Sequence, residues 1–164
     1  MIEMELVGVR VEMPSSSPIA ILREIGGAHR VLPIFIGAPE ATAIAFALEE
    51  VVTPRPMTHD LFKEVLEDFG VSLEKITVTD LREGVFHAEL ELVGSDGTHT
   101  ISSRPSDAIA LAARTGSPIF ATEDVMAEAS YLEEPEEGEG PEQAEVVEQF
   151  KEFIDSVNPE DFSS

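Results

Sequence analysis

The residues best suited to chemistry are acids, arginines and one histidine at the expected starts of three helices. An Arg-Pro pair precedes an acid in two places, at Arg55 and at Arg104. Backbone N–H groups at a helix start and a guanidinium group favour anions such as phosphate, whereas carboxylates favour hard cations. If the three helix starts converge, the set could hold a metal ion and a phosphate together. Its members are Glu40, Arg55, His59, Asp60, Arg104 and Asp107.

Each residue type in this set fits one part of phosphate chemistry. His59 would serve as a ligand or as the general acid and base, with Asp60 and Asp107 completing the catalytic residues. Arg55 and Arg104 would hold the phosphate. The carboxylates would bind Mg²⁺ or Mn²⁺, and the expected ligands are Glu40, Asp60 and Asp107.

A structural interpretation of the same residues stays open. Thr58 and Ser106 stand where N-caps belong, and Asp60 and Asp107 would then interact with the positive first turn of each helix. The arginines would pair with these acids and fix loops in place. Spacing alone does not separate a site from a pair of capped helices.

Length and composition fit one domain. The chain has 164 residues, of which 43% are hydrophobic, enough for a sizeable core. It has no cysteine, which excludes disulfides, thiolate zinc sites and a cysteine nucleophile. The N-terminal residues are acidic, and no apolar run approaches the roughly 18 residues of a membrane span. We therefore expect a cytoplasmic protein with no membrane partner.

Net charge is the most unusual bulk property. There are 33 acidic and 10 basic residues, which gives −23, and residues 123–164 alone contain 15 acidic residues and one basic residue. Such a chain repels polyanions, so any contact with RNA or DNA should be weak and short in range. The sequence also lacks a P-loop, a G-x-S-x-G elbow, a G-x-G-x-x-G loop and an H-E-x-x-H helix.

Hydrophobic periodicity predicts an α+β fold, a compact single domain over residues 1–130. Its sheet should be mostly antiparallel or mixed, with three to four helices. The expected strands are residues 4–13, 18–23, 31–36, 71–80, 85–93, 98–102 and 117–121. The expected helices are residues 41–50, 58–69, 106–115 and 123–129.

The C-terminal part differs in composition. Residues 131–142 are rich in Glu, Pro and Gly and predict an acidic linker. Residues 143–164 predict an acidic amphipathic helix and tail that docks on this domain or on a partner. Its apolar stripe is formed by Val146, Val147, Phe150, Phe153, Ile154 and Val157.

Four separated segments of this sequence resemble the bifunctional nuclease domain family. They are Leu32-Pro33-Ile34-Phe35-Ile36-Gly37 with Glu40-Ala41, then Pro54-Arg55-Pro56-Met57-Thr58-His59-Asp60-Leu61, then Arg104-Pro105-Ser106-Asp107-Ala108-Ile109-Ala110-Leu111-Ala112, and Pro118-Ile119. The resemblance spans roughly residues 1–130 in order. It implies a compact α+β domain that hydrolyses RNA and DNA.

The resemblance leaves two hypotheses for function. The first is a metal-dependent nuclease built on the candidate residues given above. The second is a non-enzymatic interaction or regulatory module that binds a protein or a small anionic ligand. This chain carries Ser102 where family members commonly have an aspartate two residues before the arginine, which weakens the site if that aspartate is a metal ligand.

The number of apolar strand residues suggests self-association. Together with the C-terminal stripe they are many for one small core, and a dimer is the commonest closed assembly. The residues concerned are Ile19, Ile21, Val31, Ile34 and Ile36. We therefore expect a homo-oligomer, most simply a dimer.

Overall fold

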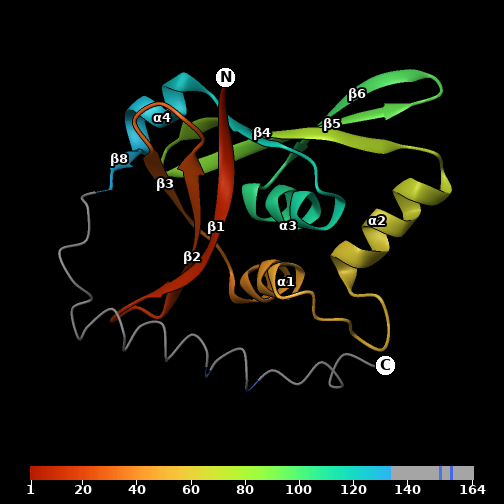
Figure 1. Cartoon of the computed structure of the whole chain (residues 1–164), viewed down its shortest axis with the longest axis horizontal. Helices are drawn as coiled ribbons and strands as arrows, with labels where there is room; N and C mark the ends of the chain where they lie inside the picture. Colours follow the sequence, from red (N-terminus) through yellow and green to blue (C-terminus); the bar gives the residue numbers. More distant parts are fainter. Residues whose placement is uncertain (134–151, 153–155, 157–164) are drawn as a thin grey trace.

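The computed structural model of the chain describes residues 1–133, 152 and 156 (Figure 1). The predicted linker over residues 131–142 lies outside these residues from position 134 onward. The predicted C-terminal helix also lies outside them, apart from Glu152 and Ser156, which are helical and exposed. No helix in the described part is long and apolar enough to cross a membrane.

The described residues form one eight-stranded mixed sheet and four helices, which confirms the α+β class expected from the sequence. The spatial order of the strands is β6-β5-β4-β7-β1-β2-β3-β8. Every neighbouring pair is antiparallel except β4 and β7. The strands are β1 (Ile2–Glu12), β2 (Ser17–Glu24), β3 (Arg30–Phe35), β4 (Ser72–Arg82), β5 (Val85–Gly94), β6 (Gly97–Ser103), β7 (Ile119–Ala121) and β8 (Tyr131–Leu132).

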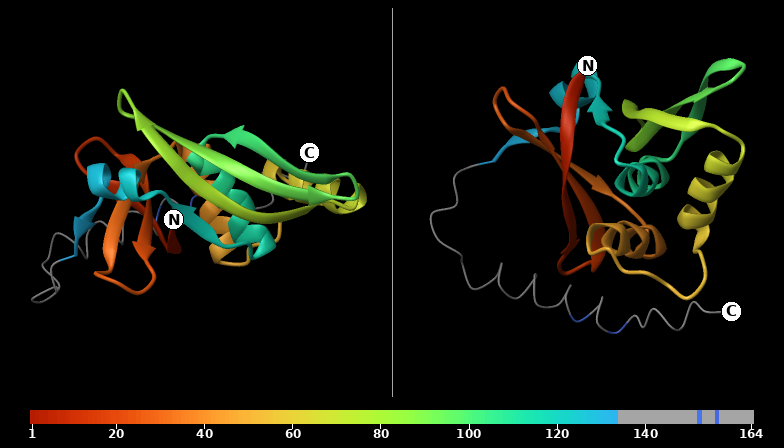
Figure 2. Two further views of the ribbon diagram at one scale, coloured as in Figure 1. Left: turned by 90° about the horizontal axis from the view of Figure 1, so that it is seen from above. Right: turned by 45° about the vertical axis from the view of Figure 1, so that its right-hand side comes forward.

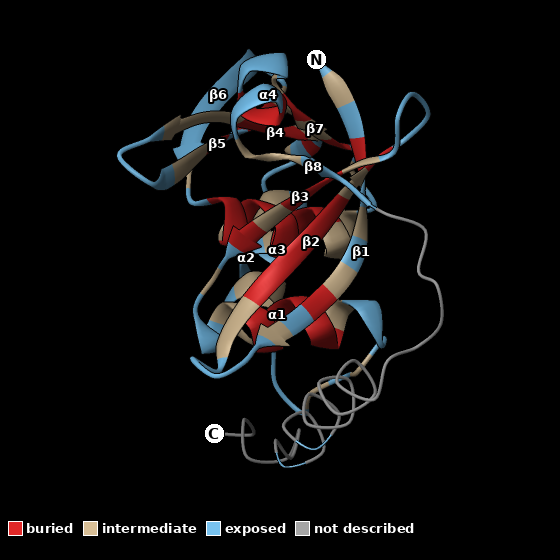
Figure 3. Ribbon diagram, turned by 90° about the vertical axis from the view of Figure 1, so that its left-hand side faces the viewer, coloured by how far each residue is buried: buried red, intermediate tan, exposed pale blue. Residues whose placement is uncertain are grey.

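The short strand β7 joins two larger groups of strands. Ile119 pairs with Met4 of β1 on one side and with Ile76 of β4 on the other. The β1–β2–β3 group and the long β4–β5–β6 group diverge from this point (Figure 2). Strand β6 is exposed along nearly its whole length, whereas β2 is mostly buried (Figure 3).

Three of the four described helices lie together between the two groups of strands, and the last helix packs separately against β3 and β4. They are α1 (Ala38–Leu48), α2 (Thr58–Asp68), α3 (Pro105–Thr115) and α4 (Glu123–Ala129). Helix α3 lies between the strand groups, α1 packs against it, and α2 lies at the outer side (Figure 1). Helix α3 buries seven residues from Pro105 to Ala112, while α2 has none in the buried class.

Small side chains let α1 and α3 pack closely. Ala41, Ala43 and Ala45 of α1 are buried, as are Ala108 and Ala112 of α3. Alanine favours the helix and permits the two backbones to approach. This packing brings the N-terminal turns of both helices into the same region, where the candidate acids and arginines lie.

The structure corrects both predicted N-caps. Helix α3 has Arg104 as its N-cap residue and Pro105 in its first turn, and Ser106 is a buried residue of that turn. Proline suits the first helical position because its φ is already helical and it has no N–H to satisfy. In α2 the N-cap residue is Met57, and Thr58 begins the helix.

Candidate functional site

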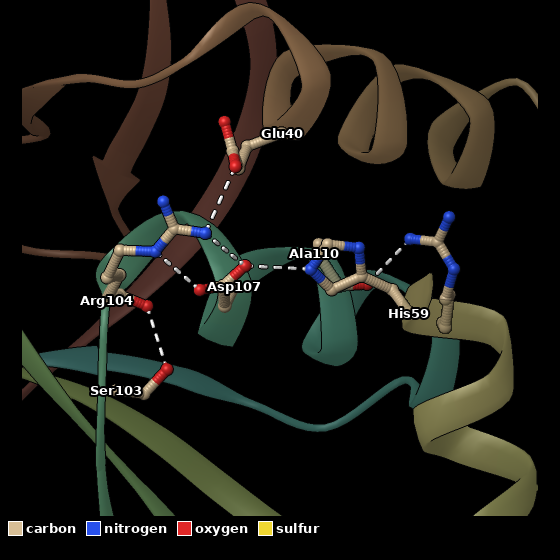
Figure 4. A network of polar contacts seen from close by, with 7 residues as sticks. Glu40, His59, Ser103, Arg104, Asp107 and Ala110 are labelled. Carbon is tan, nitrogen blue, oxygen red and sulfur yellow. Dashed lines mark hydrogen bonds and ion pairs between the residues drawn. The ribbon is translucent and has the colours of Figure 1, made fainter. Parts of the chain in front are cut away.

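Three helix starts converge on one polar network. Arg104 and Asp107 come from the start of α3, Glu40 from the first turn of α1, and His59 from the first turn of α2 (Figure 4). Four of the six residues predicted from the sequence therefore lie in one connected cluster, which we call the α1–α2–α3 network.

Arg104 occupies the middle of this network. Its Nε donates to Asp107 Oδ2 at 2.7 Å, and its Nη2 donates to Asp107 Oδ1 and to Glu40 Oε1, both at 3.0 Å. The hydrogen bonds to Asp107 and then to Glu40 raise the pKa of Arg104 above its ordinary value. The side chain is 64% exposed, and among the described residues no group accepts from its Nη1. Nη1 can therefore donate a hydrogen bond to a ligand.

Asp107 fixes the orientation of His59. His59 Nε2 lies 2.9 Å from Asp107 Oδ1, and the imidazole side chain is 14% exposed. Burial alone would raise the pKa of Asp107, but hydrogen bonds from Arg104 and His59 outweigh it and lower that pKa. An ionised carboxylate only accepts hydrogen bonds, so Nε2 donates to it, and in the neutral imidazole the lone pair is then on Nδ1.

A glycine gives Glu40 the room it needs. The Glu40 carboxylate folds back over the start of α1, where a Cβ at position 37 would collide with its Oε2. Gly37 is the N-cap residue of α1, and Glu40 lies in the first turn that follows. The positive end of the helix favours a carboxylate at that place.

Asp60 belongs to a neighbouring ion pair and not to the network itself. Its Oδ1 accepts from Arg114 Nε at 2.7 Å and its Oδ2 from the Met57 backbone N–H at 3.0 Å. Burial would raise the pKa of Asp60, yet the bonds from Arg114 and Met57 lower it. Arg114 Nη1 also donates to the Ala110 carbonyl at 2.9 Å.

Arg114 is the residue that sequence reasoning missed. Its side chain is 7% exposed and joins the last turn of α3 to the start of α2. The available signal was its spacing, because position 114 lies two helical turns after Asp107 and on the same face of α3.

Arg55 lies apart from the residues with which it was grouped. It is exposed in the loop before α2, and its carbonyl accepts a hydrogen bond from Thr53 Oγ1 at 2.6 Å. In residues 1–133 no carboxylate pairs with its guanidinium group.

The donor set does not fit a divalent cation as it stands. In the described ranges no three histidine, aspartate or glutamate side chains gather in a way that could hold a metal ion. Arg104 lies between the carboxylates of Glu40 and Asp107, and the Asp60 carboxylate is bonded to Arg114. A guanidinium group thus neutralises the acids that a metal would need.

Two hollows adjoin this region. One of about 420 Å³ is lined by Arg104, by Ser106 and by apolar residues at the end of β3 and the start of β5. The other, of about 490 Å³, lies between α1 and α2 and includes Asp60 and Arg114. The site can therefore combine proton transfer at His59 with a ligand held beside Arg104.

Comparison with known families decides the membership of this chain. Residues 20–134 match the bifunctional nuclease domain. The chain belongs to the bifunctional nuclease domain family. The matched range contains every residue of the α1–α2–α3 network as well as Asp60 and Arg114.

Two kinds of relative accompany this match. Uncharacterized proteins of two Mycobacterium tuberculosis strains are 44% identical over 165 residues, which cover 99% of this chain and 98% of theirs. Bifunctional nuclease 1 of rice, Oryza sativa subsp. japonica, is 26% identical over 102 residues, which cover 60% of this chain and 31% of the rice protein. The alignment with the relative that is named a nuclease thus covers roughly a third of that longer protein.

Proposed function

We propose that this chain is a nuclease that hydrolyses phosphodiester bonds of RNA, DNA or both, with His59 as its general base and acid. The observation that carries the proposal is the 2.9 Å contact between His59 Nε2 and Asp107, whose carboxylate Arg104 holds from the other side. The family and the rice relative support the reaction class.

The chain's own groups suffice for a proton-transfer sequence. His59 Nδ1 takes a proton from a water molecule as the water oxygen attacks phosphorus and a P–O bond breaks. Asp107 stabilises the imidazolium that forms, and the same proton then passes to the departing oxygen. Arg104 Nη1 is available to donate to a phosphate oxygen.

The decisive experiment compares two histidine variants. Labelled single-stranded RNA and DNA are incubated with wild type, His59→Ala and His99→Ala, purified in parallel. His99 lies on the exposed strand β6, pairs with Asp96 just before that strand, and serves as the matched control. His59→Ala should cut more slowly by about 100-fold or more, the usual contribution of a general acid or base. Equal rates in wild type and His59→Ala would contradict the proposal.

Metal dependence is a separate arm of this assay. The sequence predicts Mg²⁺ or Mn²⁺, but we derive no step through a metal because Arg104 lies between the expected ligands Glu40 and Asp107. Reactions with each ion and with EDTA test the prediction directly. Full activity in EDTA would exclude the metal, whereas loss restored by Mn²⁺ would require Arg104 to move aside.

The contact pattern of the arginines also favours the second hypothesis, a module that binds a protein or a small anion without catalysis. Arg104 and Arg114 are already paired with carboxylates, as expected if the acids and arginines only hold three helices together. Absence of cleavage in freshly purified wild type, with substrate binding retained, would support this function.

We also propose that the chain forms a dimer and is located in the cytoplasm. Ile19, Ile21, Val31 and Ile34 are buried within the chain, so the dimer needs another surface, and the exposed apolar side chains of α2 offer one. These are Leu61, Phe62, Val65 and Phe69. Light scattering should give twice the chain mass of 17.8 kDa, falling to one chain mass in Phe62→Ser/Phe69→Ser. Cell fractionation tests the cytoplasmic location.

A further inference from the structure

The hollow beside Arg104 differs in charge from the rest of this acidic molecule. Arg104 is the one charged residue among those that line it, and no carboxylate lines it. By contrast, the hollow between α1 and α2 is lined by Asp60, Glu50, Glu64 and Glu67 as well as by cations. Of these two hollows in a chain of net charge −23, the one beside Arg104 is therefore lined by fewer groups that repel an anion.

A second feature of this hollow is the hydroxyl group of Ser106. Ser106 is 6% exposed and lines the hollow, and within the described residues its side chain makes no hydrogen bond. In that part of the chain, a side-chain oxygen without a hydrogen bond in a buried residue is accessible to solvent, so the Ser106 hydroxyl is accessible too. A serine hydroxyl with no protein partner can both donate and accept a hydrogen bond, so it can bind a polar group that enters the hollow.

Two phenylalanines give the hollow a wall suited to a flat ring. Phe35, at the end of β3, is 61% exposed, and Phe86 of β5 lines the same space with its side chain partly buried against the core. Exposed aromatic rings in single-strand binding sites stack on nucleobases, because every base has a π face. The volume of about 420 Å³ falls in the range of small-molecule sites.

We infer that this hollow binds one nucleotide of a single-stranded substrate. The base lies on Phe35 and Phe86, and the phosphate accepts hydrogen bonds from Arg104 Nη1 and the Ser106 hydroxyl. Arg104 also holds Asp107, the partner of His59, so the subsite is joined to the proposed catalytic residues through one side chain. The inference rests on the nuclease function and names its substrate-binding element.

The test uses the full chain and a fluorescent nucleotide that a nuclease cannot cut. 2-Aminopurine riboside 5′-monophosphate has no phosphodiester bond, and its fluorescence falls when the base stacks. Wild type and three phenylalanine variants are titrated: Phe35→Leu, Phe86→Leu and the matched control Phe69→Leu. Phe69 is 81% exposed at the end of α2, away from the hollow, so its loss should leave binding unchanged.

Phe35→Leu should weaken binding by at least about 5-fold, since stacking on one ring contributes on the order of 5-fold to 150-fold. Because Phe35 is mostly exposed, this variant should keep the wild-type unfolding curve. The nucleoside without phosphate should bind more weakly than the monophosphate, and Ser106→Ala should reduce that difference. No saturable quenching in wild type, or equal affinities in Phe35→Leu and Phe69→Leu, would overturn the subsite.

The binding result and the cleavage result separate the two proposals. Quenching that depends on Phe35, in a protein that cuts no nucleic acid, supports the subsite and refutes the nuclease. Cleavage that depends on His59, without quenching, supports the nuclease and refutes the subsite.

Discussion

Asp60 joins the start of α2 to the last turn of α3, and its contacts define a stability prediction. Its two oxygens accept from Arg114 Nε and from the Met57 backbone N–H. Asp60→Asn removes the charge beside Arg114, whose side chain is 7% exposed. We expect the free energy of unfolding to fall by about 1.5–3 kcal/mol at pH 7, the range for a hydrogen bond to a charged group. Urea denaturation of wild type and Asp60→Asn measures this difference in the free energy of unfolding.

The pH dependence of this loss follows from the lowered pKa of Asp60. The ionised carboxylate stabilises the fold fully above the unfolded pKa of about 3.9, and this contribution is lost as the pH falls through the lower folded pKa. The difference between wild type and Asp60→Asn should therefore shrink below about pH 4. Asp80→Asn is the control, because its pair with Arg82 is exposed and should contribute less than about 1 kcal/mol. A constant difference down to acid pH would contradict the assignment.

Residue types and spacing predicted part of this site from the sequence. Glu40, His59, Arg104 and Asp107 were placed together because each stands near a helix start, and the structure connects them. Helical spacing places Arg114 on the same face of α3 as Asp107, but its pairing with Asp60 could not be predicted, because it depends on how α2 lies against α3. Ser106 was taken for a cap, whereas Pro105 moves the cap to Arg104 and buries the serine.

At the scale of elements, α3 and α2 are both amphipathic in sequence but differ in burial. Ile109 of α3 is fully buried, whereas Leu61 of α2 is 53% exposed. Ile109→Ala should lower the free energy of unfolding by about 2–5 kcal/mol through lost burial and a cavity. Leu61→Ala should cost about 0.5 kcal/mol or less in the isolated chain.

Urea unfolding of both variants, at a protein concentration where light scattering gives one chain mass, checks this contrast. Dilution matters because a dimer through α2 would make Leu61 buried as well. Equal losses in the monomer would mean that α2 packs more tightly than its exposed side chains indicate.

Strand β1 illustrates why periodicity predicts a strand but not its faces. Strict alternation along the expected strand 4–13 would place Val7 and Val9 on the same side of the sheet. The structure has a bulge between Leu6 and Gly8, which leaves Met4 and Val9 buried and Val7 37% exposed. A bulge inserts one residue into a strand and reverses the faces beyond it. Nothing in the local hydrophobic pattern marks that position.

At the scale of the whole molecule, local signals predicted the elements but not their spatial arrangement. The α+β class and the order of strands and helices along the chain followed from periodicity and from Gly and Pro positions, except for β8, which lies in residues predicted to be linker. The parallel pairing of β7 with β4 did not, because β7 has three residues and joins strands more than 40 positions apart. That junction determines how the two strand groups enclose α3, and so where the helix starts meet.

Net charge gives a prediction that runs against the usual behaviour of nucleic-acid enzymes. A chain of −23 repels a polyanion over the screening distance, which falls from about 30 Å at 0.01 M salt to about 8 Å at 0.15 M. The proposed site offers Arg104 as its charged contact to phosphate. Few counterions are then released on binding, and screening of the repulsion should dominate.

We therefore expect kcat/KM for a long single strand to rise as NaCl increases over this range. Cleavage of a trinucleotide should respond less, because a short substrate carries few of the repelled charges. Initial rates at five salt concentrations, with both substrates and one protein preparation, make the comparison. A steep fall with salt for the long strand would mean that many phosphates contact cations, which would require a basic surface that neither Arg104 nor the hollow beside it provides.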